Sequence, residues 1–297
     1  MKIALCLSGL AHGKNDIGRN SGGIKYSIEH FKEHLLDNPK YDVDVFVHSW
    51  STDMKEEIMH LLNPKKSIIE EQITFQETPL DLLQAVSEEE KGKLIRSGAN
   101  PNSVIGNYRA PKNTGQQTKS QLYSRKKSVD LKREYEVENN IEYDFVLMTR
   151  FDICFFTGFK FEEYDKNSFY HSNNTDFLYD GKKTKFNQAL LYRDSEKRER
   201  LKKVHRNDFN RYGHLDHWFL SSSKIMDEFS KAFDYIEHYT KTNKNLCTHA
   251  GSIPCEKIVS LHLGKMKQLG TLNNTVAIKD RIEDYELVRR WYLDSIY

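Results

Sequence analysis

The sequence predicts an α/β fold with a mostly parallel sheet flanked by helices and a helical C-terminal portion. Stretches typical of buried strands alternate with stretches of helical periodicity over residues 1–70. Polar side chains follow several of the strands, at the position where open α/β sheets bind ligands. Apolar residues return at helical spacing in the last third of the chain. Because strands and helices alternate, we expect parallel strands joined by right-handed crossovers, with helices on the faces of the sheet.

The first three strands are expected at residues 3–7, 43–47 and 67–70, and the helices between them at about 24–36 and 52–62. Each of these helices carries apolar residues three or four positions apart, and a turn signal containing Asn and Pro follows it. The order strand, helix, strand, helix, strand is what supports a parallel sheet.

The central strand is expected at Phe145 to Met148, after a long helix over about 116–137. It ends in polar residues that include Arg150 and Asp152. This pair favours a binding site for anions and metal ions at that edge of the sheet. A surface ion pair in a strand-to-loop turn is the alternative. Residues 87–115 are rich in Gly, Asn, Ser and Pro, which predicts a mobile insertion before the long helix.

The first strand ends at Ser8 and Gly9, and a loop containing four glycines follows it. Lys14 and Arg19 lie in this loop, which matches neither a dinucleotide-binding fingerprint nor a Walker loop. Such a loop can bring backbone N–H groups and cations to a phosphate. A merely flexible connection between strand and helix is the other interpretation.

Aromatic and polar residues also follow the second strand. His48 and Trp50 stand where a nucleobase or ribose could be held, although a tryptophan that caps the core would give the same pattern. Gln121 and Lys127 lie on the polar side of the long helix that leads into the central strand. We expect part of that side to line the same crevice.

The second half of the chain predicts strands at 168–171 and 187–192, a charged helix at about 195–205, and helices at 225–239 and 254–267. Candidate functional residues lie between and within these elements. An Asp between histidines can act as a general base, and such a group can also bind a metal. An imidazole inside the last helix is either a metal ligand or a core residue. The Asp between histidines is Asp216, with His214 and His217 beside it, and the imidazole inside the last helix is His262.

Composition excludes several classes of protein. The 297 residues carry 45 Lys and Arg against 43 Asp and Glu, so no global basic field marks a binder of nucleic acid. No apolar run approaches the length of about 20 residues that spans a bilayer. The four cysteines are widely spaced and indicate reduced thiols in a cytoplasmic protein. The apolar N-terminus is interpreted as a strand and not as a signal peptide.

Three sets of stretches resemble a family of GT-A-like glycosyltransferases found in bacteria, phages and large viruses. They follow one another in the same order as in that family and cover most of the chain. The resemblance implies a Rossmann-like single domain over 1–297, with a nucleotide-binding half at 1–155 and an acceptor half with C-terminal helices at 156–297. The stretches are Lys2-Ile-Ala-Leu-Cys-Leu-Ser-Gly9 with Asp44-Val-Phe-Val-His-Ser-Trp50; Ser120-Gln-Leu-Tyr-Ser-Arg-Lys-Lys127 with Tyr143-Asp-Phe-Val-Leu-Met-Thr-Arg-Phe-Asp152; and Leu215-Asp-His-Trp-Phe-Leu-Ser-Ser-Ser-Lys-Ile-Met-Asp227.

The resemblance implies transfer of a sugar from a UDP- or GDP-sugar to a glycan, lipid-linked or other hydroxyl acceptor. Arg150-Phe151-Asp152 looks like the counterpart of the family's DxD motif, so Asp152 would hold Mn²⁺ or Mg²⁺ against the diphosphate. The first Asp of that motif is Arg150 here, which could take over part of the cation's role. Asp216 would be the base of an inverting displacement.

By the same resemblance, the donor would be held at the carboxyl ends of the first strands and on the long helix. Ser8, Gly9, His48 and Trp50 would hold the nucleoside, and Gln121 and Lys127 would support the diphosphate, with Lys14 or Arg19 as further phosphate contacts. The missing DxD carboxylate keeps a rival open, a non-catalytic nucleotide- or carbohydrate-binding protein on the same scaffold. A nucleotidyltransferase fits less well, because its Gly-rich, Lys-bearing signature is missing.

Overall fold

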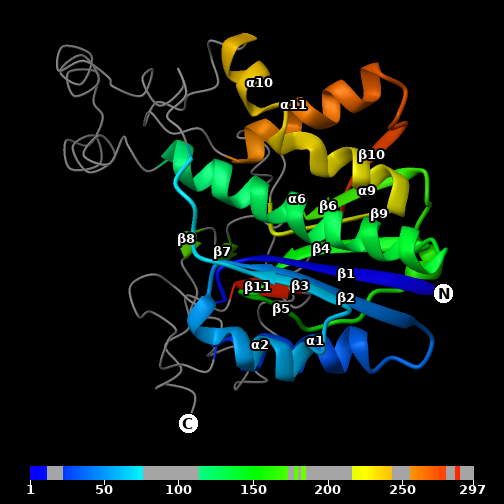
Figure 1. Cartoon of the computed structure of the whole chain (residues 1–297). Helices are drawn as coiled ribbons and strands as arrows, with labels where there is room; N and C mark the ends of the chain where they lie inside the picture. The colour runs from blue at the N-terminus through cyan, green and yellow to red at the C-terminus, as the bar shows by residue number, and fades with distance from the viewer. Residues whose placement is uncertain are drawn as a thin grey trace.

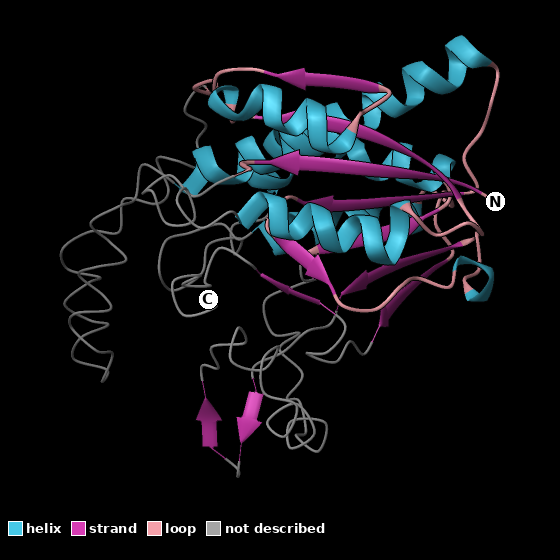
Figure 2. Cartoon of the chain, turned by 90° about the horizontal axis from the view of Figure 1, so that it is seen from below, coloured by secondary structure: helices cyan, strands magenta, loops and turns pink. Residues whose placement is uncertain are grey.

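The computed structural model describes residues 1–11, 23–75, 114–172, 177–179, 182–184, 216–242, 255–278 and 285–287. Within these ranges the molecule is built on one seven-stranded sheet, whose strands run side by side in Figures 1 and 2. In spatial order the strands are β10 (Asn274–Ile278), β6 (Ser168–Ser172), β9 (Trp218–Ser221), β4 (Phe145–Arg150), β1 (Lys2–Gly9), β2 (Asp42–Ser49) and β3 (Lys66–Ile69).

The sheet is mostly parallel, as predicted. Strands β3, β2, β1 and β4 are parallel neighbours, and β10 is parallel to β6. Only β9 among these seven runs antiparallel, to β4 on one side and to β6 on the other. The chain moves from β1 outward through β2 to β3 and then returns to the other side of β1 with β4. The order therefore reverses between β1 and β4, at the kind of switch point where open α/β sheets bind ligands.

Helices cover both faces of the sheet (Figure 1). The long helix α6 lies on one face with α9 and α11, and α1 and α2 lie on the other. Alternate residues of β1 divide between the two cores, so that Ala4 and Cys6 pack under α6 while Ile3, Leu5 and Leu7 pack under α1. The helix bounds are α1 (Gly23–Phe31), α2 (Lys55–Leu62), α6 (Thr114–Asn139), α9 (Ser223–Ser230), α10 (Ile236–Thr242) and α11 (Cys255–Gln268).

Short elements complete the described part of the chain. A π-helical turn extends α1 and 3-10 turns precede α2 and follow α9. The pairs β5 with β11 and β7 with β8 form two small antiparallel sheets. The bounds are η1 (Lys32–Leu36), η2 (Thr52–Met54), η3 (Phe161–Glu163), η5 (Lys231–Phe233), β5 (Ile153–Phe155), β7 (Phe177–Tyr179), β8 (Lys182–Thr184) and β11 (Tyr285–Leu287).

Two expectations for the C-terminal portion were wrong. The helix expected over 225–239 is broken into α9, η5 and α10, and the hydroxyl of Ser230 donates to the carbonyl of Asp227 where α9 ends. The portion is also not purely helical, because β10 joins the sheet beside β6. Its five residues include three that are β-branched, a signal too short to stand out from the sequence.

Other expectations fall partly or wholly outside the described residues. These are the strand at 187–192, the helix at 195–205, the insertion apart from 114–115, and the side chains of Lys14, Arg19 and His214. Residues 114–115 already belong to α6. In the part of the chain that the structure describes, no helix is long and apolar enough to cross a membrane.

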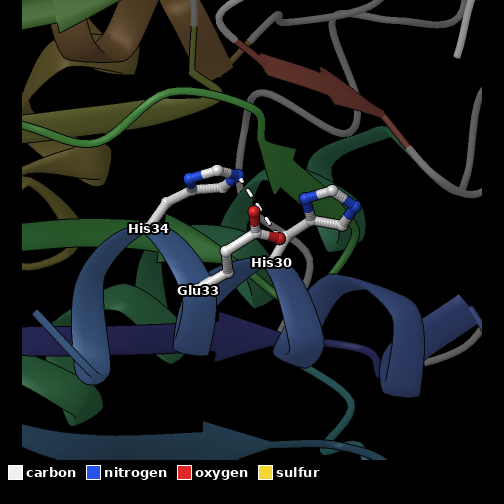
Figure 3. Close-up of side chains that lie close together, drawn as sticks. All are labelled: His30, Glu33 and His34. Carbon is white, nitrogen blue, oxygen red and sulfur yellow. Dashed lines mark ion pairs between the residues drawn. The ribbon is translucent and has the colours of Figure 1, made fainter.

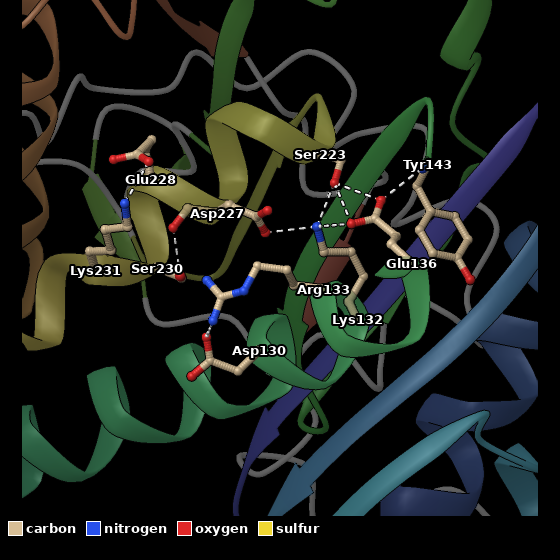
Figure 4. Close-up of polar contacts among 10 residues, drawn as sticks. All are labelled: Asp130, Lys132, Arg133, Glu136, Tyr143, Ser223, Asp227, Glu228, Ser230 and Lys231. Carbon is tan, nitrogen blue, oxygen red and sulfur yellow. Dashed lines mark hydrogen bonds and ion pairs between the residues drawn. The ribbon is translucent and has the colours of Figure 1, made fainter. Parts of the chain in front are cut away.

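A buried ion-pair network attaches α6 to α9 (Figure 4). The ammonium group of Lys132, which is 0% exposed, lies 2.8 Å from a carboxylate oxygen of Glu136 and 2.7 Å from one of Asp227. It also donates to Ser223, the first residue of α9. Glu136 in turn accepts the backbone N–H of Tyr143 at 2.9 Å, just before β4. The network therefore fixes the helix that supplies much of the site to the start of the central strand.

Candidate functional site

The candidate site lies at the carboxyl ends of β1 and β4, where the strand order reverses. Gly9 ends β1 with φ of +103°, a conformation that favours glycine over residues with a side chain. Its carbonyl accepts hydrogen bonds from the Ser49 hydroxyl at 3.0 Å and from the Trp50 N–H at 3.2 Å. Ser8 is buried and its hydroxyl donates to the carbonyl of Thr149 in β4 at 3.3 Å. These bonds hold the three strand ends β1, β2 and β4 together.

Arg150 and Asp152 form a bidentate ion pair at the end of β4. Nε of Arg150 lies 2.8 Å from Oδ1 of Asp152, and a terminal guanidinium nitrogen lies 2.6 Å from Oδ2. Each side chain is 17% exposed, so the pair is shielded from water but reachable from the edge of the sheet. Parallel donation of this kind is among the stronger arrangements of a charged pair.

Asp216 lies two residues before β9 and meets groups from two elements, α6 and β4. Because β9 runs antiparallel to β4, its first residues lie beside the carboxyl end of β4. Arg125 of α6 donates to Oδ2 of Asp216 at 3.1 Å and to its backbone carbonyl at 2.6 Å. Gln121, one helical turn earlier, donates to the same carboxylate. Arg150 lies 4.0 Å from Oδ1 of Asp216. Two guanidinium groups thus converge on one carboxylate.

The charges at this edge shift the ionisation of the acidic side chains. Burial opposes ionisation of Asp216, but the guanidinium groups of Arg125 and Arg150 outweigh burial and hold its pKa well below the usual range. Burial, and then the negative charge of Asp216, raise the pKa of Glu256 in the first turn of α11. Asp216 is therefore a stable anion and a weak proton acceptor, whereas Glu256 accepts a proton more readily than an ordinary glutamate.

A hydrogen-bonded chain leads from Gly9 through α6 to His48. The N–H of Gly9 donates to the hydroxyl of Ser124 at 2.7 Å, and that oxygen lies 2.7 Å from Nδ1 of His48. Nε2 of His48 lies 3.1 Å from a carboxylate oxygen of Glu70, just after β3. Because a carboxylate only accepts, this network assigns the proton to Nε2 and makes Nδ1 the acceptor. Burial, only partly offset by Glu70, lowers the pKa of His48.

Aromatic rings pack against His48 at this end of the sheet. Trp50 is buried and stacks on Tyr123 of α6 with ring centroids 5.5 Å apart, and it meets His48 edge-on at 4.6 Å. Lys127 places its ammonium group 5.3 Å from the centroid of Tyr123. Trp50 therefore packs as a core residue beneath Tyr123, whose half-buried ring lies nearer the surface. Among the described residues, no hydrogen-bond partner faces the buried indole nitrogen of Trp50.

The structure thus brings together most of the residues that the sequence pointed to: Ser8, Gly9, His48, Trp50, Gln121, Lys127, Arg150, Asp152 and Asp216 all lie on these strand ends or on the adjoining stretch of α6. His262 does not join them. Its Nδ1 lies 2.8 Å from the hydroxyl of Tyr239 and its Nε2 lies 2.9 Å from the carbonyl of Glu228. Both ring nitrogens are hydrogen-bonded in the core between α9, α10 and α11, so His262 is a packing residue here.

The acidic residues of the site fit guanidinium groups better than a divalent cation. Carboxylate oxygens are the ligands that Mn²⁺ and Mg²⁺ prefer, and Asp152 and Asp216 offer them. Both oxygens of Asp152, however, accept from Arg150, and Asp216 accepts from Arg125 and Gln121. In the described ranges, no three His, Cys, Asp or Glu side chains at this edge lie within ligand distance of one another.

Four residues at this edge were not singled out from the sequence, and Ser124 was expected only as part of the polar side of the long helix. The four are Glu70, Tyr123, Arg125 and Glu256. Arg125 is 3% exposed, and it lies over the ring of Phe219 as well as beside Asp216. Its spacing from Gln121, four positions on a helix, is the signal that could have identified it, since such residues share a helix face. Glu70 carries no comparable signal, because only the pairing of β3 with β2 brings it to His48.

Neither a protein-family model nor a curated protein matches this chain.

Proposed function

We propose that the protein is a GT-A-like glycosyltransferase that moves a sugar from a nucleoside-diphosphate sugar, such as a UDP- or GDP-sugar, to a hydroxyl group of a glycan or lipid-linked acceptor. The observation that carries the proposal is the convergence of Arg125 and Arg150 at the switch point between β1 and β4. The partly exposed guanidinium group of Arg150, with the buried positive charge of Arg125 behind it, suits a ligand with two linked phosphates.

The donor would bind beside the internal partners of the two arginines. In its absence Asp152 and Asp216 satisfy Arg150 and Arg125. A bound diphosphate would accept a hydrogen bond from the terminal nitrogen of Arg150 that the bidentate pair with Asp152 leaves over, and the two aspartates would keep the guanidinium planes in place. The half-buried ring of Tyr123, which stacks on Trp50, lies on the same stretch of α6 as Arg125, so that the nucleoside would lie along the ends of β1 and β2.

In the proposed reaction, a bond forms between the acceptor oxygen and the anomeric carbon while the bond from that carbon to the diphosphate breaks. The electron pair leaves with the diphosphate, and Arg125 and Arg150 stabilise its growing charge. Asp216 would hold both arginines. Its lowered pKa makes it a weak base. We assign removal of the acceptor proton to Glu256, because it follows Cys255, whose Sγ accepts from Arg125 at 3.2 Å, and because its pKa is raised.

Mn²⁺ or Mg²⁺ would add Lewis-acid stabilisation of the leaving diphosphate if it bound at Asp152. Because Arg150 occupies both oxygens of that carboxylate, we derive no step through a metal ion. The proposal therefore gives the charge-neutralising role to the two arginines.

Donor hydrolysis without an acceptor tests the proposal. We expect one member of a panel of UDP-, GDP-, dTDP- and CMP-sugars to be cleaved slowly by the wild type, with and without EDTA. Asp152→Asn should slow that cleavage at least tenfold, because the amide cannot accept both guanidinium bonds. Cleavage abolished by EDTA and restored by Mn²⁺ would instead place a metal at Asp152. If a nucleotide raises the melting temperature but nothing is cleaved, the protein is a non-catalytic binder.

A further inference from the structure

A second cluster of metal-ligating side chains lies on the other face of the sheet. His30 at the end of α1, with Glu33 and His34 in η1, places one ligand atom from each residue within 4.8 Å of the others. Across the described ranges, this is the one group of three His, Cys, Asp or Glu residues that meets that distance. Helix α1 and α6 lie on opposite faces of the sheet (Figure 1), and His30 contacts Phe155 and Phe156, beyond the arginine site.

The local helix geometry gathers these three side chains. Residues at positions i, i+3 and i+4 share one helix face. The helix also widens here into a π turn, in which the N–H of Asp37 donates to the carbonyl of Lys32 at 2.9 Å. Single π turns of this kind are frequent at functional sites. Figure 3 shows the two imidazole rings and the carboxylate on the same side of the helix.

The cluster has one anchored ligand and an open side. His30 is 4% exposed, lies edge-on against Phe156 at 5.2 Å, and has a backbone hydrogen-bond partner at Phe155. When one ring nitrogen of an imidazole binds a metal, a hydrogen bond from the other ring nitrogen commonly orients the ring. Glu33 is exposed and His34 is half-buried, with 3.8 Å between Oε2 of Glu33 and Nε2 of His34. The centroids of the two imidazole rings are 5.6 Å apart.

We propose that His30, Glu33 and His34 form a binding site for a divalent transition metal ion of the zinc class. Two imidazoles and one carboxylate match the ligand set of open zinc sites, in which water or another ligand completes the coordination. Ligand atoms around tetrahedral zinc lie about 3.3 Å apart. Side-chain rotation therefore has to shorten the present separations, which reach up to 4.8 Å, by up to about 1.5 Å. Imidazole ligands also disfavour Mg²⁺, which separates this site from any metal at Asp152.

The test is a titration of the metal-free protein, purified without a histidine tag, with Co²⁺ followed by visible absorption and then displaced by Zn²⁺. We expect one Co²⁺ per chain with the spectrum of a nitrogen- and oxygen-ligated ion, and no displacement by millimolar Mg²⁺. His34→Gln and Glu33→Gln should each weaken binding at least tenfold. His34 is the better target because its side chain is 19% exposed and can change with less effect on the core, whereas His30 is buried.

Two control variants locate the ion. His60→Gln removes an exposed imidazole from the neighbouring helix α2, and Asp152→Asn alters the sheet edge. Both should bind Co²⁺ as the wild type does. The proposal fails if the wild type binds no Co²⁺ or if His34→Gln binds Co²⁺ as tightly as the wild type does. It also fails if His60→Gln or Asp152→Asn is the variant that loses Co²⁺ binding. Since the readout is metal binding, the result does not depend on whether the protein transfers sugars.

Discussion

Replacing Arg150 with alanine is expected to lower kcat/KM for donor hydrolysis roughly 100- to 1,000-fold, the usual effect of removing one group that stabilises developing charge. The loss arises because Arg150 is the group that links Asp152 with Asp216 at the end of β4. Its removal would leave the negative charges of both aspartates facing the diphosphate. The measurement is the rate of nucleotide release from the donor that the wild type cleaves.

Two further variants make this expectation specific. Arg150→Lys keeps the charge but cannot donate in parallel to Asp152, so its rate should lie between those of the wild type and Arg150→Ala. Arg133→Ala removes an arginine that is 42% exposed and paired with Asp130 on α6, and it should leave the rate unchanged. A rate for Arg150→Ala within twofold of the wild type would contradict the role given to this guanidinium group.

Lys132→Met is expected to destabilise the fold by about 3–5 kcal/mol, the usual cost of removing one partner from a buried charge network. Lys132 is fully buried, and its loss would leave the carboxylates of Glu136 and Asp227 without their shared cation. Burial already raises the pKa of Asp227 despite Lys132, so that carboxylate is costly to keep ionised. The check is the free energy of unfolding from urea denaturation followed by circular dichroism.

The matched control is Lys241→Met in α10. Lys241 also faces a glutamate one helical turn away, but the two side chains are 62% and 68% exposed. Exposed pairs contribute at most about 1 kcal/mol, so this variant should unfold almost as the wild type does. Equal effects of the two substitutions would show that the network in Figure 4 adds nothing beyond surface pairing.

The sequence predicted the strands and helices whose signals are local and long. The expected elements at 3–7, 43–47, 67–70 and 116–137 all appear, each within two residues of its predicted ends. The pattern of β10 was too short to recognise, and the antiparallel direction of β9 depends on pairing between segments about seventy residues apart. Direction within a sheet is set by tertiary contacts that periodicity along the chain does not record.

The same distinction applies to the candidate site. Arg150 and Asp152 could be found because a strand end marks them, and the structure pairs them directly. Arg125 was missed because a charged residue on a helix usually faces solvent, and only packing against Asp216 and Phe219 buries it. The position of Asp216 was foreseen, but its lowered pKa follows from two arginines that approach from different elements. No pattern in the sequence reports that convergence.

Calorimetric titration tests whether Arg125 and Arg150 form a diphosphate site. UDP and GDP are titrated into the wild type and Arg150→Ala, each beside the corresponding nucleoside. We predict that one diphosphate binds the wild type at least tenfold more tightly than its nucleoside, and that Arg150→Ala loses most of this difference. Equal affinity for diphosphate and nucleoside, or a preference that survives Arg150→Ala unchanged, would contradict the claim.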